Sequence, residues 1–203
     1  MSKEFIPYDV IRNNAIKMAY RIYREGFIPD VIYVSLRGGA YIGNVLSEYF
    51  KIVRKEAARP VFYAAVVARS YAGINQREQV RIDGWTYSPE YLRSGDKVLI
   101  VDDIYDSGRT INHLAEVILA KGLPRQDVKI AVHDYKVCKY RQEKTLPIAP
   151  DYWCRKHVLE DPSDEVWIHY MSHELVGLSA AELEKHYFAE DPELREAFGP
   201  IKK

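Results

Sequence analysis

The sequence predicts an α/β fold in which a doubly wound, mostly parallel sheet is joined by a small additional lobe and a helical C-terminal tail. Runs with strand character alternate with helical patterns along the chain. Residues 98–101 (VLIV) are apolar throughout, as in a parallel strand buried on both faces, and acids and small polar residues follow them directly. The 203 residues are 47% hydrophobic, which suits one substantial core. We therefore expect a single domain over residues 1–203.

The first part of the chain reads as helix, strand, helix and strand. Asp9 is expected to cap a helix that ends at Gly26, because the apolar residues between them share one helical face. A strand is expected at residues 31–35, a helix with an apolar face at 40–51, and a second buried strand at 61–68. This order is typical of a βαβ unit with a parallel sheet.

The second part of the chain contains the remaining strands. Residues 69–96 are polar, aromatic and too numerous for an ordinary connection, which indicates a lid or excursion. After the strand at 98–101, a helix is expected from Arg109 and another strand at 128–132. Residues 136–174 contain three prolines and read as irregular, and a helical tail is expected from Ser179.

Composition limits the possible functions. Lys plus Arg and Asp plus Glu number 29 each, so the chain as a whole has no strong field toward nucleic acid or membrane, and we expect neither as a partner. No apolar run approaches ~18 residues and the start MSKEF is polar, which favours a cytoplasmic protein. Cys138 and Cys154 fit neither a disulfide framework nor a zinc spacing.

The segment VLIVDDIYDSGRT, residues 98–110, carries the main functional signal. In open α/β sheets, ligands bind beyond the carboxyl ends of the strands, where a helix N-terminus attracts phosphate. Gly108 allows close approach of the backbone to an anion, and Ser107 and Thr110 add hydroxyl donors. Asp102 and Asp103 would repel a phosphate unless they held Mg²⁺ or the vicinal hydroxyls of a sugar. A phosphorylated ribose satisfies both requirements; the alternative is ordinary turn and N-cap chemistry.

This combination resembles the signature of the type I phosphoribosyltransferases, which bind phosphoribosyl pyrophosphate (PRPP) through two adjacent acids and a small loop. The resemblance spans residues 31–174. It implies Mg²⁺ as cofactor, held by Asp102 and Asp103 through ribose hydroxyls or water. It also implies a core of about residues 7–134, with a hood formed by 1–6 and about 135–175. The residues expected to bind phosphoribose are Asp102, Asp103, Asp106, Ser107, Gly108, Arg109 and Thr110.

Asp106 is the expected catalytic residue. Bond formation to a purine nitrogen requires a proton to leave the base, and a carboxylate near the ribose can accept or stabilise it. In the hypoxanthine-guanine relatives the matching aspartate contacts purine N7. The alternative role of Asp106 is an N-cap of the following helix, and both roles are compatible.

Two further segments complete the expected PRPP site. Arg37, Gly38 and Gly39 follow a strand and open a helix. This position alone fits a pyrophosphate loop and a solvated turn equally well, and the resemblance favours the pyrophosphate loop. In purine phosphoribosyltransferases the matching loop often has a non-proline cis peptide, here predicted between Leu36 and Arg37. Ser70 and Tyr71 match a pair in the mobile lid of the hypoxanthine-guanine group; a solvated hairpin is the alternative.

The base pocket is expected at the ends of two predicted strands. Lys136 can donate to the 6-oxo group of a purine, and Trp167 can stack on the ring, with Ile168 beside it. The alternatives are a solvated lysine and a core tryptophan. The resemblance also offers Glu174 as an acid near the metal or pyrophosphate, although the stretch before it departs from the family pattern by one added residue.

The resemblance implies transfer of a 5-phosphoribosyl group from PRPP to hypoxanthine, guanine or xanthine, with release of pyrophosphate. The expected partners are PRPP, the purine base and further copies of the chain, as a homodimer or homotetramer. The alternative is a PRPP-sensing regulator or a non-catalytic subunit that retains the ligand site. Net charge zero and the lack of a recognisable helix-turn-helix argue against the regulator.

Overall fold

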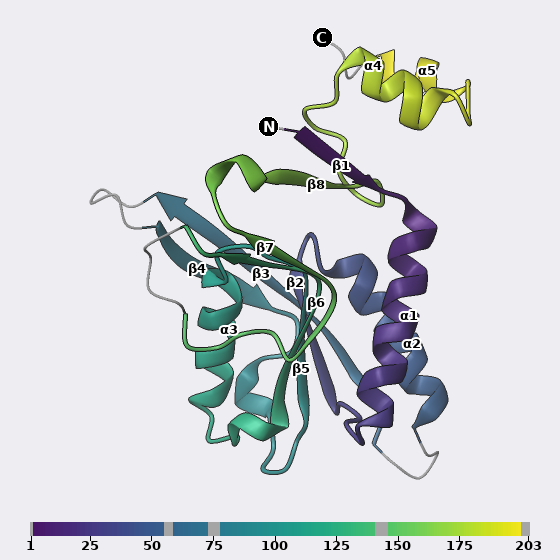
Figure 1. Cartoon of the computed structure of the whole chain (residues 1–203). Coiled ribbons are helices and arrows are strands. Elements are labelled where there is room, and N and C mark those ends of the chain that lie inside the picture. Colours follow the sequence, from purple (N-terminus) through teal and green to yellow (C-terminus); the bar gives the residue numbers. More distant parts are fainter. Residues whose placement is uncertain (1, 55–58, 73–77, 141–145, 200–203) are drawn as a thin grey trace. The chain divides into compact units, whose positions relative to one another are not determined.

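The fold is described from a computed structural model that covers residues 2–54, 59–72, 78–140 and 146–199, with the backbone alone at 69–72 and 78–79. The chain divides into two compact units, Met1–Ser172 and His173–Lys203. The first unit contains a six-stranded sheet in the order β4-β3-β2-β5-β6-β7 (Figure 1). All neighbouring strands in this sheet are parallel except β3 and β4. The expected α/β fold with a mostly parallel sheet is confirmed.

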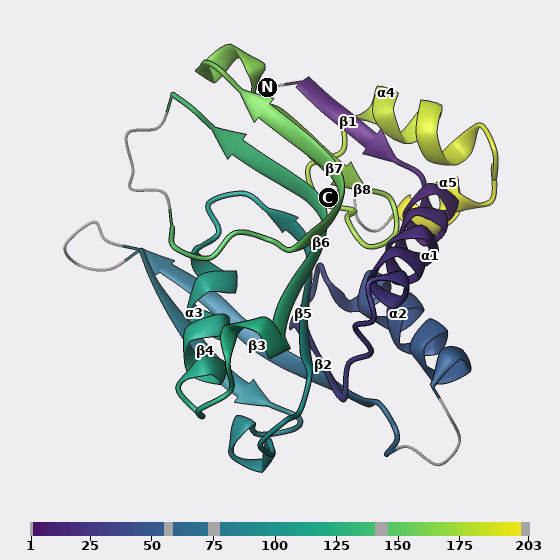
Figure 2. The same ribbon diagram turned by 60° about the horizontal axis from the view of Figure 1, so that its bottom comes forward.

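The sheet is doubly wound around its two central strands. Helix α1 (Tyr8–Arg24) and helix α2 (Ala40–Val53) pack on one face, and α3 (Arg109–Leu119) packs on the other (Figures 1 and 2). Successive residues of β2 (Val31–Leu36) alternate between the two cores, since Ile32 and Val34 belong to the first and Val31 and Tyr33 to the second. Both faces of the central strands are buried at residues 31–34 and 98–101, which explains why these stretches carry no charged residue.

The strands are longer than the sequence pattern indicates. Strand β3 spans Phe62–Ala72 and pairs with β4 (Glu78–Trp85), so part of the predicted excursion is antiparallel sheet. Strand β5 spans Val98–Tyr105 and β6 spans Val128–Cys138. Asp102 and Asp103 therefore lie within β5 and not beyond it. The apolar pattern ends where the strands reach the functional edge, although the backbone pairing continues.

The expectation of irregular structure over residues 136–174 was wrong. This region contains β7 (Tyr152–Leu159), which extends the main sheet, and β8 (Val166–Tyr170), which pairs in parallel with β1 (Ser2–Ile6). Strand β7 has no apolar alternation because it carries Arg155 and His157, whose side chains bind a buried carboxylate of β6. A strand that buries ion pairs lacks the pattern on which sequence prediction depends.

The predicted cap at Asp9 was also wrong, since α1 begins at Tyr8 with Pro7 in the N-cap position. Proline has no N–H to satisfy and its φ is preset, so it fits the first positions of a helix. Asp9 lies in the first helical turn, where its charge still opposes the positive end of the helix dipole.

The second unit contains the predicted helical tail. Ser179 begins α4 (Ala180–Leu183) with a capping box: Ser179 Oγ accepts from Glu182 N, and Ser179 N donates to Glu182 Oε2 at 2.7 Å. One π-helical turn (Glu184–Phe188) and α5 (Leu194–Phe198) follow. Leu183, Phe188 and Phe198 form a small core of their own. Among the described residues of the whole chain, no helix has the length and hydropathy needed to cross a bilayer.

Tyr33 provides a test of core packing. Its side chain is fully buried, its hydroxyl has no hydrogen-bond partner among the described residues, and its ring contacts Trp85 edge-on at 4.9 Å. We expect Tyr33→Phe to leave the free energy of unfolding unchanged or to raise it by about 1 kcal/mol, because an unsatisfied buried hydroxyl is removed. Chemical denaturation measures this.

Tyr152→Phe is the matched control, since the Tyr152 hydroxyl donates to Glu25 Oε2 at 2.9 Å and its loss should cost about 1–2 kcal/mol. A loss of stability in Tyr33→Phe as large as that in Tyr152→Phe would contradict the interpretation.

Candidate functional site

The topology places two loops at the same edge of the sheet. Strands β2 and β5 are parallel neighbours, but the chain leaves β2 through α2 to reach β3 on one side, and leaves β5 through α3 to reach β6 on the other. Ligands of open α/β sheets bind at such a switch point, beyond the carboxyl ends of the strands. The loop after β2, residues 37–39, and the segment 102–110 both lie at this edge of the sheet.

Asp102 and Asp103 lie where the pairing of β5 changes. Strand β2 pairs with β5 only as far as Val101, whereas β6 continues to pair with it through Tyr105. Asp102 Oδ1 accepts from Asp103 N at 3.0 Å, and Asp103 Oδ1 accepts from Ile104 N at 2.8 Å. Burial, followed by the charge of Asp103, raises the pKa of Asp102 well above its ordinary value. A cation at this edge would stabilise the ionised form of Asp102.

The loop after β2 packs directly against the acids. A Cβ atom on Gly38 would lie 2.2 Å from Asp103 Oδ2, and one on Gly39 would lie 2.6 Å from the carbonyl oxygen of Val101. The Leu36–Arg37 peptide bond is cis, as the resemblance predicted. Arg37 itself is exposed and forms no ion pair with the described part of the chain. Two segments separated by more than sixty residues in sequence thus form one site, and glycine is required where they meet.

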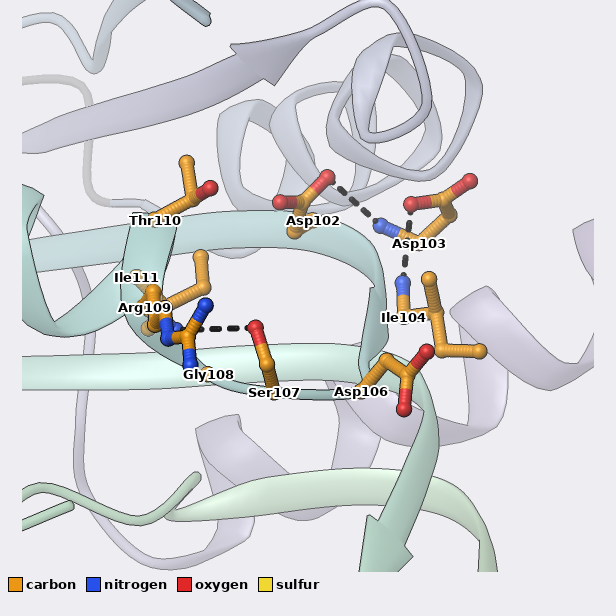
Figure 3. Close-up of a pocket in the computed structure, with 9 residues that line it drawn as sticks. All are labelled: Asp102, Asp103, Ile104, Asp106, Ser107, Gly108, Arg109, Thr110 and Ile111. Atoms are coloured by element: carbon orange, nitrogen blue, oxygen red, sulfur yellow. Dashed lines mark hydrogen bonds between the residues drawn. The ribbon is translucent and has the colours of Figure 1, made fainter. Parts of the chain in front are cut away.

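The carboxyl end of β5 and the segment that follows it form an open pocket with a volume of about 220 Å³. Figure 3 shows its lining residues: Asp102, Asp103, Ile104, Asp106, Ser107, Gly108, Arg109, Thr110 and Ile111. Every residue predicted to bind phosphoribose therefore lines a single pocket. Ser107 Oγ accepts from Arg109 N at 3.5 Å, and the N-terminus of the 11-residue helix α3 lies at the pocket. The first N–H groups of a helix have no intrahelical acceptor, which suits an anion.

Gly108 shapes this loop. It occupies the N-cap position of α3 with φ of 74°, and a Cβ atom on it would lie 2.1 Å from the ring of Tyr105. The N-cap position of α3 is therefore occupied by Gly108 and not by Asp106, so the alternative role of Asp106 as the N-cap residue is not the one observed. The exposed Asp106 side chain lines the pocket.

Sequence reasoning missed Asn112, which holds the loop from behind. This buried residue of α3 donates through Nδ2 to the carbonyl oxygen of Gly108 (3.0 Å), the hydroxyl oxygen of Tyr105 (2.9 Å) and the carbonyl oxygen of Ile148 (2.9 Å). Its Oδ1 accepts from Ile148 N at 3.0 Å. The available signal was a single amide between apolar positions of the helix, since a buried amide must have several partners.

The base side of the predicted site is built on β6 and β8. Lys136 is only 8% exposed, and its Nζ donates to Glu165 Oε2 and to the carbonyl oxygen of Val166, both at 3.2 Å. Trp167 is 53% exposed, whereas the side chain of Ile168 lies in the core. Lys136 is therefore not a solvated lysine and Trp167 is not a core tryptophan, so neither alternative role is observed.

Glu165, which the sequence analysis did not single out, connects the two sides. Its carboxylate accepts from Lys136 and also from the hydroxyl of Tyr140. Side-chain ligand atoms of Glu165, Asp106 and Cys138 all lie within 4.8 Å of one another. A buried lysine needs an anionic partner. From the sequence, this requirement was the only indication that an acid such as Glu165 lies beside Lys136.

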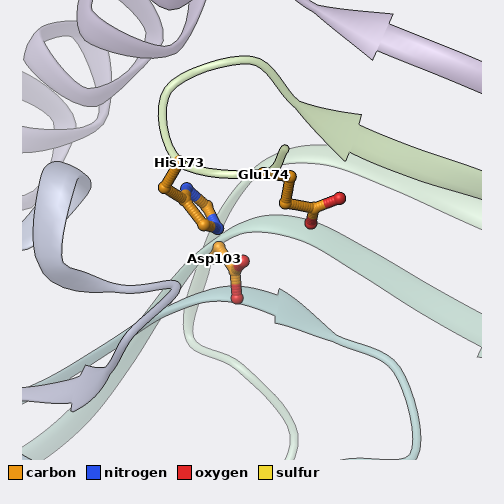
Figure 4. A group of neighbouring side chains, drawn as sticks. All are labelled: Asp103, His173 and Glu174. Carbon is orange, nitrogen blue, oxygen red and sulfur yellow. The ribbon is translucent and has the colours of Figure 1, made fainter. Parts of the chain in front are cut away.

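The predicted roles of the lid pair, Ser70 and Tyr71, and of the acid Glu174 stay predictions. Ser70 and Tyr71 lie in β3, where their backbones pair with Val80 and Gln79, but their side chains are outside the described residues. His173 and Glu174 lie on the segment after β8 (Figure 4), in the second unit, where the Glu174 carbonyl oxygen accepts from the Tyr187 hydroxyl at 3.3 Å.

A buried carboxylate, Asp134, lies two residues before Lys136 on β6. Its Oδ2 accepts from His133 Nδ1 at 2.6 Å and from the Tyr170 hydroxyl at 2.7 Å. Its Oδ1 is 2.6 Å from His157 Nε2 and 3.2 Å from Arg155 Nε. We call these five residues the Asp134 cluster. Burial alone would raise the pKa of Asp134, but hydrogen bonds from His133 and His157 lower it far below its ordinary value.

Comparisons with known proteins agree with this arrangement. Residues 8–170 match the family described as the phosphoribosyl transferase domain. The hypoxanthine-guanine phosphoribosyltransferase of Cricetulus griseus is 25% identical over 155 residues, which cover 75% of this chain and 67% of that protein.

Two solved structures share the fold. A purine phosphoribosyltransferase from Pyrococcus horikoshii has a TM-score of 0.64 at 20% identity, covering 88% of this chain and 99% of the other. A hypothetical protein from Neisseria gonorrhoeae with bound ppGpp has a TM-score of 0.63 at 21% identity, covering 97% of both chains.

The contact between the loops predicts a strong effect of a single methyl group. We expect Gly38→Ala to lower the free energy of unfolding by about 1–3 kcal/mol, because the added Cβ overlaps the Asp103 carboxylate. Gly84→Ala is the control, since a Cβ there meets no atom of the described residues within 4 Å. The double variant Gly38→Ala/Asp103→Ala removes the carboxylate that the new Cβ overlaps, so it should recover part of the lost stability. If the effects of the two substitutions were purely additive, the overlap would not be the cause of the loss.

The Asp134 cluster predicts acid sensitivity. Because its folded-state pKa is lowered, Asp134 stabilises the fold above its unfolded pKa of about 3.9, and this stability is lost as the pH falls below that value. At pH 7 we expect Asp134→Asn to cost about 3 kcal/mol of unfolding free energy. The difference from wild type should shrink when denaturation is repeated toward pH 3, and a difference independent of pH would contradict the assignment.

Proposed function

The chain belongs to the phosphoribosyltransferase family, and from this premise we propose that it transfers a 5-phosphoribosyl group from PRPP to a 6-oxopurine. The products would be pyrophosphate and a nucleoside monophosphate, with hypoxanthine, guanine or xanthine as the base. One observation carries the proposal: two adjacent acids, a phosphate-sized loop at a helix N-terminus and a glycine loop meet at the switch point of the sheet.

The parts of PRPP have matching chemistry in this pocket. The 5-phosphate suits the amides and hydroxyls of residues 107–110, which include the N-terminus of α3. The ribose hydroxyls suit the carboxylates of Asp102 and Asp103. Pyrophosphate suits the loop of Arg37, Gly38 and Gly39, whose backbone lies against Asp103.

Mg²⁺ fits the donor set on the acidic side. Hard carboxylate oxygens are the ligands that this ion prefers, and the raised pKa of Asp102 reflects burial and a neighbouring charge that a cation would offset. When bound, Mg²⁺ would neutralise the charge of the leaving pyrophosphate. Asp102 and Asp103 would hold it through the ribose hydroxyls or water, and Arg37 would contribute further positive charge.

Asp106 is the proposed catalytic residue. A bond forms between a purine imidazole nitrogen and ribose C1′ as the bond between C1′ and the pyrophosphate oxygen breaks, and the purine loses a proton. The exposed carboxylate of Asp106 lines the pocket within 4.8 Å of Glu165, the partner of Lys136, so it lies between the phosphate loop and the base side. Its role would be to accept or stabilise that proton.

Lys136 supports the choice of a 6-oxopurine. Its ammonium donates hydrogen bonds and accepts none, so it complements a 6-oxo group and not a 6-amino group. Trp167 is exposed enough to stack on a base, and Ile168, whose side chain is in the core, would act through its backbone. Twenty-five per cent identity to the hamster hypoxanthine-guanine enzyme supports the same class of base.

A second candidate is a nucleotide-responsive regulator that retains the ligand site. The similarity over 97% of both chains to a protein with bound ppGpp favours it, because ppGpp combines a guanine base with pyrophosphate groups. Binding of ppGpp without turnover of any base would support this candidate.

Pyrophosphate release tests the proposal directly. The purified chain is given Mg²⁺, PRPP and one base at a time from hypoxanthine, guanine, xanthine, adenine, uracil and orotate. We expect turnover with at least one 6-oxopurine and none with the other bases. Tight PRPP binding without turnover of any base would overturn the enzyme and favour the regulator.

Asp106→Asn tests the proton-transfer role. We expect kcat to fall by about 100-fold or more while the fold stays intact, because the amide cannot accept the purine proton as the carboxylate can. Asp127→Asn, at the amino end of β6 and away from the pocket, is the matched control and should keep its kcat. Turnover near wild type in Asp106→Asn would refute the role.

A further inference from the structure

Tyr170 joins the acidic side of the site to its base side. It is the last residue of β8, the strand that also carries Trp167 and Ile168, and it is 1% exposed. Its hydroxyl lies 3.1 Å from the carbonyl oxygen of Asp103 and 2.7 Å from Asp134 Oδ2. One phenol therefore contacts the backbone of β5 at the acids and a side chain of β6.

The Asp134 end of this link is fixed from several directions. Asp134 is opposite Ile104 of β5 and Arg155 of β7 in the register of the sheet. Its carboxylate accepts hydrogen bonds from His133, His157 and Tyr170 and forms an ion pair with Arg155. His133 contacts Asn14 of α1 at 3.1 Å, and Arg155 also pairs with Glu4 of β1 at 2.6 Å. The carboxylate is thus held by both sheets, and Tyr170 is the member that extends the cluster to Asp103.

The Tyr170 hydroxyl acts as a hydrogen-bond donor and does not transfer its proton. Burial and the neighbouring Asp134 charge raise the pKa of the Tyr170 phenol far above its ordinary value, so the hydroxyl keeps its hydrogen. Both nearby atoms, a carbonyl oxygen and an ionised carboxylate oxygen, are acceptors. The phenol hydrogen is therefore shared between them, which fixes the orientation of the ring.

We infer that Tyr170 is a positioning residue that holds the Asp103 backbone in register with β6 and β8, and thereby couples binding of PRPP to binding of the base. This inference rests on the proposed function, because Asp103 is assigned to the phosphoribose and β6 and β8 to the base. If the register is lost, the acids can still bind PRPP and the pocket can still bind a base, but each ligand no longer orders the site for the other.

Tyr170→Phe removes only the hydroxyl, and Tyr152→Phe provides a matched control. Tyr152 is also a buried tyrosine, and its hydroxyl also donates to a carboxylate, but that partner is Glu25 at the end of α1. A merely structural hydrogen bond would give the two variants the same phenotype. Thermal unfolding of both variants sets a temperature at which each is folded.

The coupling is measured by calorimetry with Mg²⁺ and PRPP, with and without an oxopurine that carries carbon in place of N9 and so cannot react. We expect the wild type and Tyr152→Phe to bind PRPP at least about fivefold more tightly with the base analogue, and Tyr170→Phe to show less than about a twofold effect. In turnover, Tyr170→Phe should lose about tenfold in kcat/KM for PRPP. Equal coupling in all three proteins would overturn the inference.

A local measurement separates this inference from the proposed function. Hydrogen exchange of the Ile104 amide, which donates to Asp103 Oδ1 at 2.8 Å, should be about tenfold faster in Tyr170→Phe than in wild type and unchanged in Tyr152→Phe. If the wild type neither binds PRPP nor turns over a base, the proposed function fails and so does the inferred coupling, while a selective change in exchange would still identify Tyr170 as the residue that holds Asp103. Unchanged exchange in Tyr170→Phe would remove the positioning role even in an active enzyme.

Discussion

The contact on which the site depends is the approach of the loop after β2 to the carboxyl end of β5. At Gly38 the backbone comes so near the Asp103 carboxylate that a side chain has no room, and Gly39 meets the Val101 carbonyl in the same way. This contact brings residues 37–39 and the two adjacent acids together at one edge of the sheet, where the proposed PRPP site lies. The switch point of the sheet makes the contact possible, because the chain leaves its two central strands in opposite directions.

A second constraint lies behind this edge, in the polar interior between the two sheets. The Asp134 carboxylate binds residues from β6, β7 and β8, which lets a strand as polar as β7 complete the main sheet. Removing one partner of such a cluster leaves an uncompensated charge, so the cluster specifies how these strands lie together. Asp134 lies two residues before Lys136, and the Tyr170 hydroxyl links its carboxylate to the carbonyl oxygen of Asp103. Through these two connections the cluster helps to arrange the proposed ligand site.

The buried Lys136–Glu165 pair adds a condition on base binding. Lys136 has a carboxylate partner before any ligand arrives, so a purine 6-oxo group would share an ammonium that Glu165 already neutralises. Such an arrangement lowers the cost of burying the lysine and leaves its hydrogen-bond direction defined. The same carboxylate lies near Asp106, so the chemistry proposed at Asp106 and the recognition proposed at Lys136 take place in one continuous polar region.

The sequence alone determined the fold class, the turn from β5 into α3 and the glycines at positions 38, 39 and 108, because these depend on local features: apolar strands, a helix start and residues without a side chain. The sequence also predicted the helical tail from Ser179, which in the structure begins with a capping box. The sequence indicated β8 only through the strand end expected at the base pocket, and it did not reveal β7, the continuation of β5 through the acids, or the roles of Asn112, Glu165 and Tyr170. Each of these depends on polar side chains whose partners are distant in the chain, with Tyr170 sixty-seven residues from Asp103. No pattern of hydropathy records such pairing, and only the tertiary structure decides which polar residues are buried together.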